Sequence, residues 1–402
     1  MRILLSAYSC NPNKGSEPGV GWNWLHELAK YNEVWVLFYT GQEQYESVSL
    51  GVYNLTQKEN IHLIPIDVPF PFGIKKLFRF RYEVWQIKAY FAAKKIIKEN
   101  QIDLIHQVTI AAWWFSGYYY KLKIPFLIGP ILGGQKTNTK FFHFVQYKTK
   151  LYEYARNISI GLLSKIYPKA KYSFKKAAIV FAGNKETSLF LNGYFNLDSK
   201  LFLTTGVETL PTIADKRINN NQIEFLVTGL LIPCKNLFFL FEVLSQIPQK
   251  VKWRLRVVGE GPLGKVFKKA VIKNKLEKKI EFVGYVPKNK IDKYYKESDI
   301  FLFPSFREGA PTVILEAMTF ALPTIAFKQN GADIMLDSSC GILIDITNPQ
   351  RMVNDFANAI ITLYENPQLR IEMGNNARKK VEENFLWEKR GKEMQKYYEA
   401  II

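Results

Sequence analysis

Short apolar runs alternate with helical segments along most of this 402-residue chain. In the first half, the runs that we expect to form strands are residues 3–7, 34–39, 61–65, 103–106, 126–129, 179–182 and 201–204. In the second half they are residues 224–228, 253–258, 280–283, 300–303 and 323–326. This alternation predicts an α/β protein with parallel sheets and helices on both faces of each sheet. In such sheets, ligands bind beyond the carboxyl ends of the strands.

The length allows two domains, each able to bury a core of its own. The apolar pattern breaks over residues 206–222, where Pro211, Asp215, Lys216 and a run of three Asn predict a linker. We therefore expect a first domain over residues 1–205 and a second domain over residues 223–384.

The formal net charge of +19 is unevenly distributed. Residues 1–200 hold 26 Lys and Arg against 13 Asp and Glu, whereas the remainder holds 29 against 23. Such a bias favours an anionic partner, for which nucleic acid, an anionic bilayer and a phosphate-bearing acceptor are candidates. Nucleic acid is disfavoured because no recognisable nucleic-acid-binding module is present.

Aromatic and basic residues are interleaved in two clusters, residues 69–82 and residues 136–176. Aromatic side chains mixed with cations suit an interfacial contact with a membrane. The alternative is an ordinary solvated helix face whose aromatic residues fill the core. Because no stretch reaches the roughly 20 apolar residues of a spanning helix, we expect a soluble protein or one bound only at the membrane surface.

Cysteine and histidine usage gives no sign of a cofactor. Three scattered cysteines suggest neither a disulfide framework nor metal-ligand spacing, and four scattered histidines give no metal cluster. We expect no cofactor and no required metal, and a reducing compartment.

The sequence over residues 303–318 contains the strongest functional signal. A buried strand is expected to end at Pro304, and a helix over residues 311–321 to begin with Pro311, where the missing N–H costs nothing. The free N–H groups of the first helical turn favour an anion. Glu308 precedes this helix and Glu316 lies within it. The plain alternative is that Glu308 complements the helix dipole and Glu316 pairs with a Lys or Arg.

Two features of the first half also lie beside expected strand ends. Residues 11–21 form a glycine-rich turn before a helix, an arrangement that lets backbone N–H groups approach a phosphate. Its spacing is not that of a dinucleotide fingerprint, so a hydride-transfer enzyme is disfavoured. His106 ends another strand, and both a catalytic and a structural role are open for it.

The frame E-G-x-P-x-x-x-x-E-A-M over residues 308–318, followed by a strand, resembles the signature of retaining glycosyltransferases of family 4, within the glycosyl transferases of group 1. The resemblance covers residues 222–400 and, more loosely, parts of the first half. It implies the GT-B architecture, in which two Rossmann-like domains with parallel sheets face a central cleft. It also implies that the helix over residues 385–402 crosses back to the first domain.

The resemblance implies roles for individual residues of this chain. Glu308 would lie beside the donor sugar hydroxyls, Glu316 would accept hydrogen bonds from the ribose, and Lys235 would bind the diphosphate. His106 matches the first histidine of a D-x-x-H-x-H pattern, whose second histidine is replaced here by Val108. The remaining implied donor contacts are Gly15, Gly229, Val286, Gly309, Ala310, Pro311 and Thr312.

Three departures from the family pattern stand out, and one of them is residues 205–208, which read Thr-Gly-Val-Glu where the family often has Asn-Gly-Val-Asp. Leu230 stands where the family usually has an arginine, and Phe320 stands where a glycine commonly follows the motif. The arginine would contact the diphosphate, so Leu230 keeps open a catalytically weak subunit that binds sugar nucleotides or membranes within a polysaccharide assembly system. An epimerase or phosphorylase on the same architecture lacks supporting motifs.

The resemblance thus implies an enzyme that transfers a sugar from a nucleoside-diphosphate sugar to a hydroxyl acceptor with retention of configuration. Since no covalent nucleophile is evident, the implied mechanism is a front-face displacement. The expected acceptor is a lipid-linked or cell-surface polysaccharide or glycolipid precursor. The expected location is cytoplasmic, peripheral on the inner face of the cell membrane.

Overall fold

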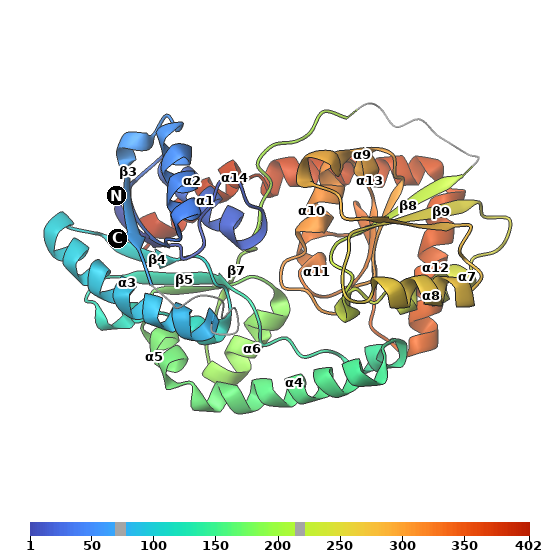
Figure 1. Cartoon of the computed structure of the whole chain (residues 1–402), viewed down its shortest axis with the longest axis horizontal. Coiled ribbons are helices and arrows are strands. Elements are labelled where there is room, and N and C mark those ends of the chain that lie inside the picture. The colour runs from blue at the N-terminus through green and yellow to red at the C-terminus, as the bar shows by residue number, and fades with distance from the viewer. Residues whose placement is uncertain (69–77, 214–221) are drawn as a thin grey trace. The chain divides into compact units, whose positions relative to one another are not determined.

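The computed structural model describes residues 1–68, 78–213 and 222–402. By their internal contacts these residues form two units, each built around a parallel sheet (Figure 1). Unit 1 consists of Met1–Gly134, Ile160–Glu208 and Leu386–Ile402, and unit 2 consists of Gln135–Ser159 and Thr209–Phe385. The predicted α/β class with two parallel sheets is confirmed.

Unit 1 contains a seven-stranded sheet in the order β3-β2-β1-β4-β5-β6-β7, with every pair parallel. Its strands are β1 (Arg2–Ser6), β2 (Glu33–Tyr39), β3 (Ile61–Ile66), β4 (Leu104–Gln107), β5 (Phe126–Ile131), β6 (Ile179–Ala182) and β7 (Lys200–Leu201). The strand order reverses between β1 and β4, so the loops after these two strands diverge at the carboxyl edge.

Helices cover both faces of this sheet. Trp24, Val48 and Tyr398 bury their side chains on one face, from α1 (Ser16–Leu28), α2 (Gln42–Tyr53) and α14 (Trp387–Glu399). Trp85 and Phe174 do so on the other face, from α3 (Phe78–Asn100) and α5 (Pro168–Lys176). The remaining helical elements of unit 1 are α6 (Lys185–Phe195) and the short turns η1 (Lys58–Asn60), η3 (Trp113–Phe115) and η4 (Tyr119–Lys121).

Unit 2 contains a six-stranded parallel sheet in the order β10-β9-β8-β11-β12-β13. The strands are β8 (Ile223–Thr228), β9 (Trp253–Val258), β10 (Ile280–Gly284), β11 (Ile300–Phe303), β12 (Thr324–Phe327) and β13 (Gly341–Ile344). Its helices are α7 (Leu237–Ser245), α8 (Gly264–Lys273), α9 (Asp292–Lys296), α10 (Thr312–Thr319), α11 (Ala332–Met335), α12 (Pro349–Glu365) and α13 (Pro367–Asn384), with turns η5 (Thr139–Phe144), η6 (Pro233–Lys235) and η7 (Lys288–Lys290). The order reverses between β8 and β11, which are adjacent at the centre of the sheet.

Both units include a stretch that is distant in sequence. Gln135–Ser159, which we expected in the first domain, belongs to unit 2. There the Phe141 ring stacks on Phe306, with centroids 5.7 Å apart, and meets Phe327 edge-on at 4.8 Å. The helix α4 (Tyr147–Ile166) begins in this stretch. These aromatic contacts explain why the stretch packs in unit 2 and not in unit 1.

The C-terminal helix α14 belongs to unit 1. Its Trp387 ring packs edge-on against Trp24 of α1, with centroids 5.2 Å apart. Gly391 permits the close approach of the two helices, because a Cβ there would come within 2.7 Å of the Glu27 Cβ. The fold of unit 1 therefore depends on the last part of the sequence.

Two expectations concern residues outside the described ranges. Residues 69–77 of the first basic and aromatic cluster lie outside them, as do residues 214–221 of the expected linker. Within the described ranges, no helix has both the length and the apolar character needed to cross a bilayer.

Candidate functional site

Lys235 and Glu308 meet at the point where the strand order of unit 2 reverses. Lys235 lies in η6 after β8, and Glu308 lies in the loop after β11, the neighbouring strand. The Lys235 Nζ is 2.7 Å from the Glu308 Oε1, and the two side chains are 11% and 23% exposed. The carboxyl ends of strands at such a reversal are where ligands of open α/β sheets bind. The structure thus brings together two residues that lie far apart in the sequence.

The loop geometry leaves room for Lys235. Gly229 has a φ of +128°, which favours glycine, and a Cβ there would lie 2.9 Å from the Lys235 Cε. The ammonium is also 5.5 Å from the centre of the Phe303 ring, within range of a cation–π interaction. Backbone bonds fix the two loops to each other, since the Phe306 amide donates to the Cys234 carbonyl at 3.0 Å. The cation is therefore held in place by its surroundings.

Glu316 lies on α10 and completes this group of charges. The Tyr295 hydroxyl donates to the Glu316 Oε2 at 2.7 Å and is 3.1 Å from the Thr228 Oγ1. Burial raises the pKa of Glu316, and the hydrogen bond from Tyr295 and the charges of Lys288 and Lys235 offset part of this rise. The partner of Glu316 is thus a tyrosine hydroxyl, and not the Lys or Arg of the plain alternative.

Phe320 has a specific contact in this structure. Its ring stacks on Tyr295, with centroids 5.2 Å apart and an interplanar angle of 3°. The stacking fixes the ring whose hydroxyl reaches Glu316. The residue that departs from the family pattern therefore supports the position of a site carboxylate.

The segment between the two carboxylates differs slightly from expectation. The helix α10 begins at Thr312, one residue after Pro311, because Pro311 has a ψ of 86° and lies outside the helical range. The Thr312 amide donates to the Ala310 carbonyl at 3.0 Å. Gly309 and Ala310 belong to the loop that joins Glu308 to this helix.

Glu153 holds the loop that carries Glu308. The Glu153 carboxylate accepts hydrogen bonds from Arg307 Nη2 at 2.7 Å, Arg156 Nε at 2.9 Å and Thr137 Oγ1 at 2.7 Å. In addition, the Gln135 Nε2 donates to the Glu308 carbonyl at 3.1 Å. Burial alone would raise the pKa of Glu153, but the hydrogen bonds from its partners outweigh burial and lower this pKa. Sequence reasoning missed this cluster because Glu153 and Arg307 are 154 residues apart in the sequence.

We expect Glu153→Ala to lower the free energy of unfolding by about 3 kcal/mol, because it leaves two arginines without their buried partner. Chemical denaturation at pH 7 measures this loss. Since the pKa of Glu153 is lower in the folded state, its stabilising effect is present above the unfolded-state pKa of about 4.3 and disappears as the pH falls further. Asp355→Ala, which removes an exposed partner of Arg351, is the control and should cost less than about 1 kcal/mol. Equal losses in the two variants would contradict this role.

Leu230 and Val286 also lie at the carboxyl edge of the same sheet, Leu230 in the connection that carries Lys235. Leu230 follows β8 and its side chain is 58% exposed. Val286 follows β10 and is half-buried. The exposed position of Leu230 leaves space for a longer side chain.

In unit 1, Gly15 is the residue before α1. No described heavy atom beyond its chain neighbours lies within 4 Å of the position that a Cβ would take. The following turn is tied to the loop after β4, since the Glu17 Oε1 accepts a hydrogen bond from the Ala111 amide at 3.1 Å. Gly15 therefore lies in a well-anchored loop, and its role as a donor contact stays a prediction.

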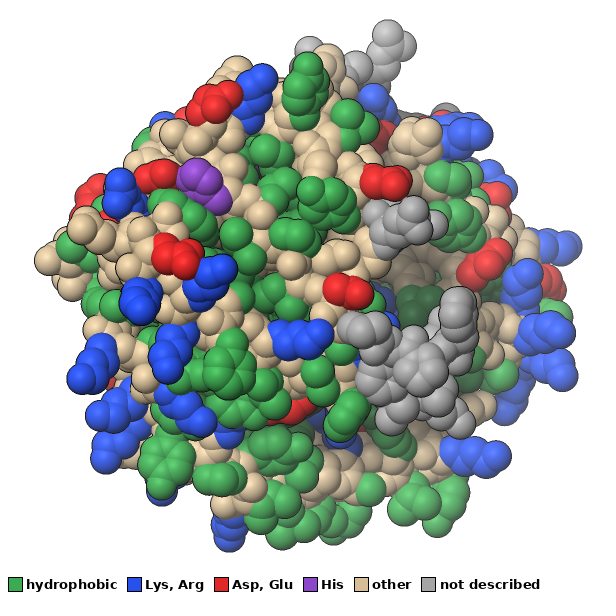
Figure 2. Space-filling view, turned by 60° about the vertical axis from the view of Figure 1, so that its left-hand side comes forward, with side chains coloured by type: hydrophobic (Ala, Val, Ile, Leu, Met, Phe, Trp, Pro, Cys, Tyr) green, Lys and Arg blue, Asp and Glu red, His purple; other side chains and the backbone are tan. Residues whose placement is uncertain are grey.

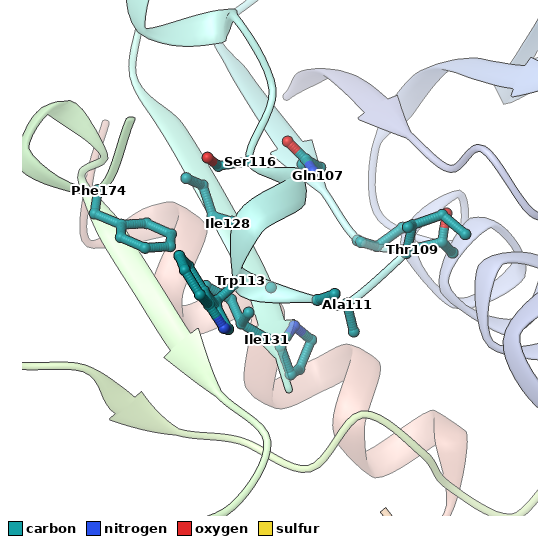
Figure 3. A pocket seen from close by; sticks show the side chains of 13 residues that line it. Gln107, Thr109, Ala111, Trp113, Ser116, Ile128, Ile131 and Phe174 are labelled. Atoms are coloured by element: carbon teal, nitrogen blue, oxygen red, sulfur yellow. The ribbon is translucent and has the colours of Figure 1, made fainter. Parts of the chain in front are cut away.

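A narrow pocket lies beside the carboxyl ends of β4 and β5 (Figure 3). Trp113, Ile131 and Phe174 form an apolar wall, and Gln107 and Ser116 contribute polar atoms. The pocket has room for about one water molecule, which is too small for a sugar ring. In this conformation it is not a substrate site by itself.

His106 is a structural residue of unit 1. It lies in β4, is completely buried, and its Nε2 is 2.8 Å from the Gly129 carbonyl. Its Nδ1 is 2.6 Å from the Tyr398 hydroxyl of α14. Burial lowers the pKa of His106 to about 4, so the ring is neutral at pH 7. Because both ring nitrogens have partners inside the core, we remove His106 from the candidate catalytic residues.

Known proteins resemble this chain in sequence. One uncharacterized glycosyltransferase of Methanocaldococcus jannaschii is 31% identical over 60% of this chain and 63% of its own length. A second one from the same organism is 25% identical over 82% of this chain and 84% of its own length. The Escherichia coli UDP-Gal:alpha-D-GlcNAc-diphosphoundecaprenol alpha-1,3-galactosyltransferase is 30% identical over 42% of this chain and 43% of its own length. This chain thus spans less than two thirds of the length of two of these three relatives.

Solved structures resemble this chain in fold. The lipopolysaccharide outer core galactosyltransferase WaaB matches over 100% of both chains with a TM-score of 0.68 at 14% identity. Two parallel α/β units with this likeness define a GT-B glycosyltransferase fold. Residues 211–380, which lie within unit 2, match the family model described as glycosyl transferases group 1.

Proposed function

We propose that this protein transfers a sugar from a nucleoside-diphosphate sugar to a hydroxyl acceptor, with retention of the anomeric configuration. The observation that carries the proposal is the contact between Lys235 and Glu308 at the strand reversal of unit 2, with Glu316 close by. One cation and two carboxylates at this position match the three chemical groups of such a donor, namely the diphosphate, the sugar and the ribose.

Lys235 would act on the leaving group. When the bond to the sugar breaks, negative charge builds up on the diphosphate, and a preorganised ammonium stabilises it. Its partner Glu308 would accept hydrogen bonds from the donor sugar hydroxyls. In the front-face displacement that we propose, the leaving diphosphate takes the proton of the attacking hydroxyl, so the protein supplies no covalent nucleophile.

Glu316 would bind the ribose. A vicinal pair of hydroxyls donates two hydrogen bonds, which suits a carboxylate. The Tyr295 hydroxyl already donates to Glu316 and leaves the other carboxylate oxygen for the ligand. The arrangement supports the binding of a ribonucleotide.

The acceptor that we propose is a lipid-linked or cell-surface saccharide precursor. The name of the Escherichia coli relative specifies a diphosphoundecaprenol acceptor and a UDP-sugar donor. The exposed basic and aromatic side chains of α3 and α5 in unit 1 also fit an acceptor held at a membrane. We therefore propose UDP-sugars as the first donors to test and a peripheral location on the inner face of the cell membrane.

A thermal-shift screen of nucleotides and nucleotide sugars, followed by an assay for released nucleoside diphosphate, tests the proposal. We expect one nucleoside diphosphate and its matching sugar conjugates to raise the melting temperature, and one conjugate to be turned over. If no nucleotide sugar raised the melting temperature at millimolar concentration, the proposed function would be wrong.

Leu230 supports a second candidate, a binding subunit with weak turnover. We expect Leu230→Arg to strengthen binding of the nucleoside diphosphate by about tenfold, because a second cation would contact the diphosphate. Isothermal titration calorimetry measures the change, and Leu230→Gln, which lacks the charge, serves as control. A weak enzyme should gain turnover in the arginine variant, whereas an unchanged affinity would show that this position does not face the diphosphate.

A further inference from the structure

Three neighbouring elements of unit 1 form a surface that we call the basic face. It consists of α3, residues 119–123 and α5. The Lys121 Nζ is 6.0 Å from the centre of the Tyr90 ring of α3, and the rings of Tyr120 and Tyr172 stack with centroids 6.4 Å apart. Lys169 of α5 pairs with Glu83 of α3 at 2.6 Å. The three elements are therefore in contact and present one surface.

The basic face carries a large share of the protein's charge. It contains twelve Lys and Arg against two Glu, a net of +10 in a chain of net charge +19. One of the two acids, Glu83, is already paired with Lys169. The cations whose side chains are exposed here are Arg79, Lys88, Lys94, Lys95, Lys98, Lys121, Lys123, Lys171, Lys175 and Lys176. An electrostatic field of this sign attracts an extended anionic surface.

Large apolar side chains project from the same elements. Phe80, Ile87 and Phe91 of α3 are 57%, 42% and 61% exposed, and Tyr172 of α5 is 60% exposed. The spacing of seven and four residues puts the three α3 side chains on one stripe of the helix, next to Lys94 and Lys98. Figure 2 shows hydrophobic and basic side chains interspersed over the lower half of the view, with few acidic ones.

We propose that the basic face is the surface by which this protein binds a bilayer containing anionic lipids. Exposed aromatic and aliphatic side chains enter the headgroup region, while the surrounding lysines contact lipid phosphates. A nucleic acid would attract the same charges and would stack on Phe91, but it would give no reason for the exposed aliphatic side chain of Ile87. This surface would bring the protein to a lipid-linked acceptor, so the inference rests on the proposed function.

The test is binding of the full chain to vesicles without any donor present. We expect binding to vesicles with phosphatidylglycerol, weak binding to pure phosphatidylcholine vesicles, and a loss of affinity as salt rises. Ile87→Ser with Phe91→Ser should weaken binding about tenfold, and Lys171→Gln with Lys175→Gln about 30-fold, since each cation near an anionic surface contributes about 1 kcal/mol.

Matched controls lie elsewhere in unit 1. Leu50→Ser with Tyr53→Ser removes an exposed leucine and tyrosine from α2, whose buried side chains lie on the opposite face of the sheet, and should leave binding unchanged. Lys58→Gln with Lys200→Gln removes two exposed cations elsewhere and should change binding less than about threefold.

Three outcomes would overturn the inference. They are no binding to anionic vesicles at low salt, equal losses in the test and control pairs, and preferential binding of single-stranded RNA that the Ile87 and Phe91 substitutions leave intact. Release of nucleoside diphosphate is measured separately in the same variants. Turnover without vesicle binding would contradict the membrane-binding role of the basic face but not the proposed sugar transfer. Vesicle binding without turnover would contradict the proposed sugar transfer but not the membrane-binding role.

Discussion

Replacing Lys235 with alanine should lower the rate of sugar transfer by about 100- to 1,000-fold. The ammonium is the positive charge at the strand reversal of unit 2, where we place the leaving diphosphate. The affinity for the nucleoside diphosphate should also fall by about 10- to 100-fold, because a hydrogen bond to a charged group contributes about 1.5–3 kcal/mol. Steady-state kinetics and calorimetry measure the two effects.

A control cation separates this local effect from the general loss of charge. Lys328 lies in the same unit and its side chain is mostly exposed. Its Nζ forms a loose pair with the Oδ1 of Asp345, at 4.0 Å. We expect Lys328→Ala to change neither turnover nor affinity. If Lys235→Ala kept normal turnover while folded, as judged by its melting temperature, Lys235 would not be the diphosphate ligand.

Glu308→Gln should lower transfer by about 100-fold while it strengthens the binding of the free nucleoside diphosphate. The first effect follows because an amide is a weaker hydrogen-bond acceptor for the sugar hydroxyls than a carboxylate. The second follows because Glu308 competes with the diphosphate for Lys235 when no ligand is bound. Calorimetry with the diphosphate alone, followed by turnover with the sugar conjugate, measures both.

The two variants are expected to change the affinity for the diphosphate in opposite directions, which makes them informative together. A purely structural pair would lose stability in both variants and would shift diphosphate affinity in the same direction. A result in which Glu308→Gln weakened diphosphate binding as much as Lys235→Ala would therefore contradict the competition that we infer from their 2.7 Å contact.

Local patterns in the sequence predicted the secondary structure of the site well. The strand before Pro304 and a helix beginning with Pro311 follow from short apolar runs and from proline at a helix start. Both are present, as β11 and as α10, which begins one residue later at Thr312. The approach of Lys235 to Glu308 requires β8 and β11 to be neighbours, which no local pattern specifies. The family resemblance, and not the periodicity of the sequence, placed these two residues in one site.

The supporting residues show where the prediction stopped. Tyr295 and Phe320 are separated by a strand and a helix, and their stacking follows from the packed fold. Glu153 is 154 residues from Arg307 in the sequence and was assigned to the wrong side of the domain division. His106 looked equally suited to catalysis or to the core, and only its two hydrogen bonds within unit 1 decided for the core.

The interleaving of the chain between the units affects how the protein can be made. Trp24 lies in the core of unit 1 against Trp387, which is translated more than 360 residues later. During synthesis, the surface of α1 that α14 covers stays uncovered until α14 has been translated. A fragment that stops before α14 would expose this tryptophan and should aggregate, so the first half of the gene is a poor unit for separate expression.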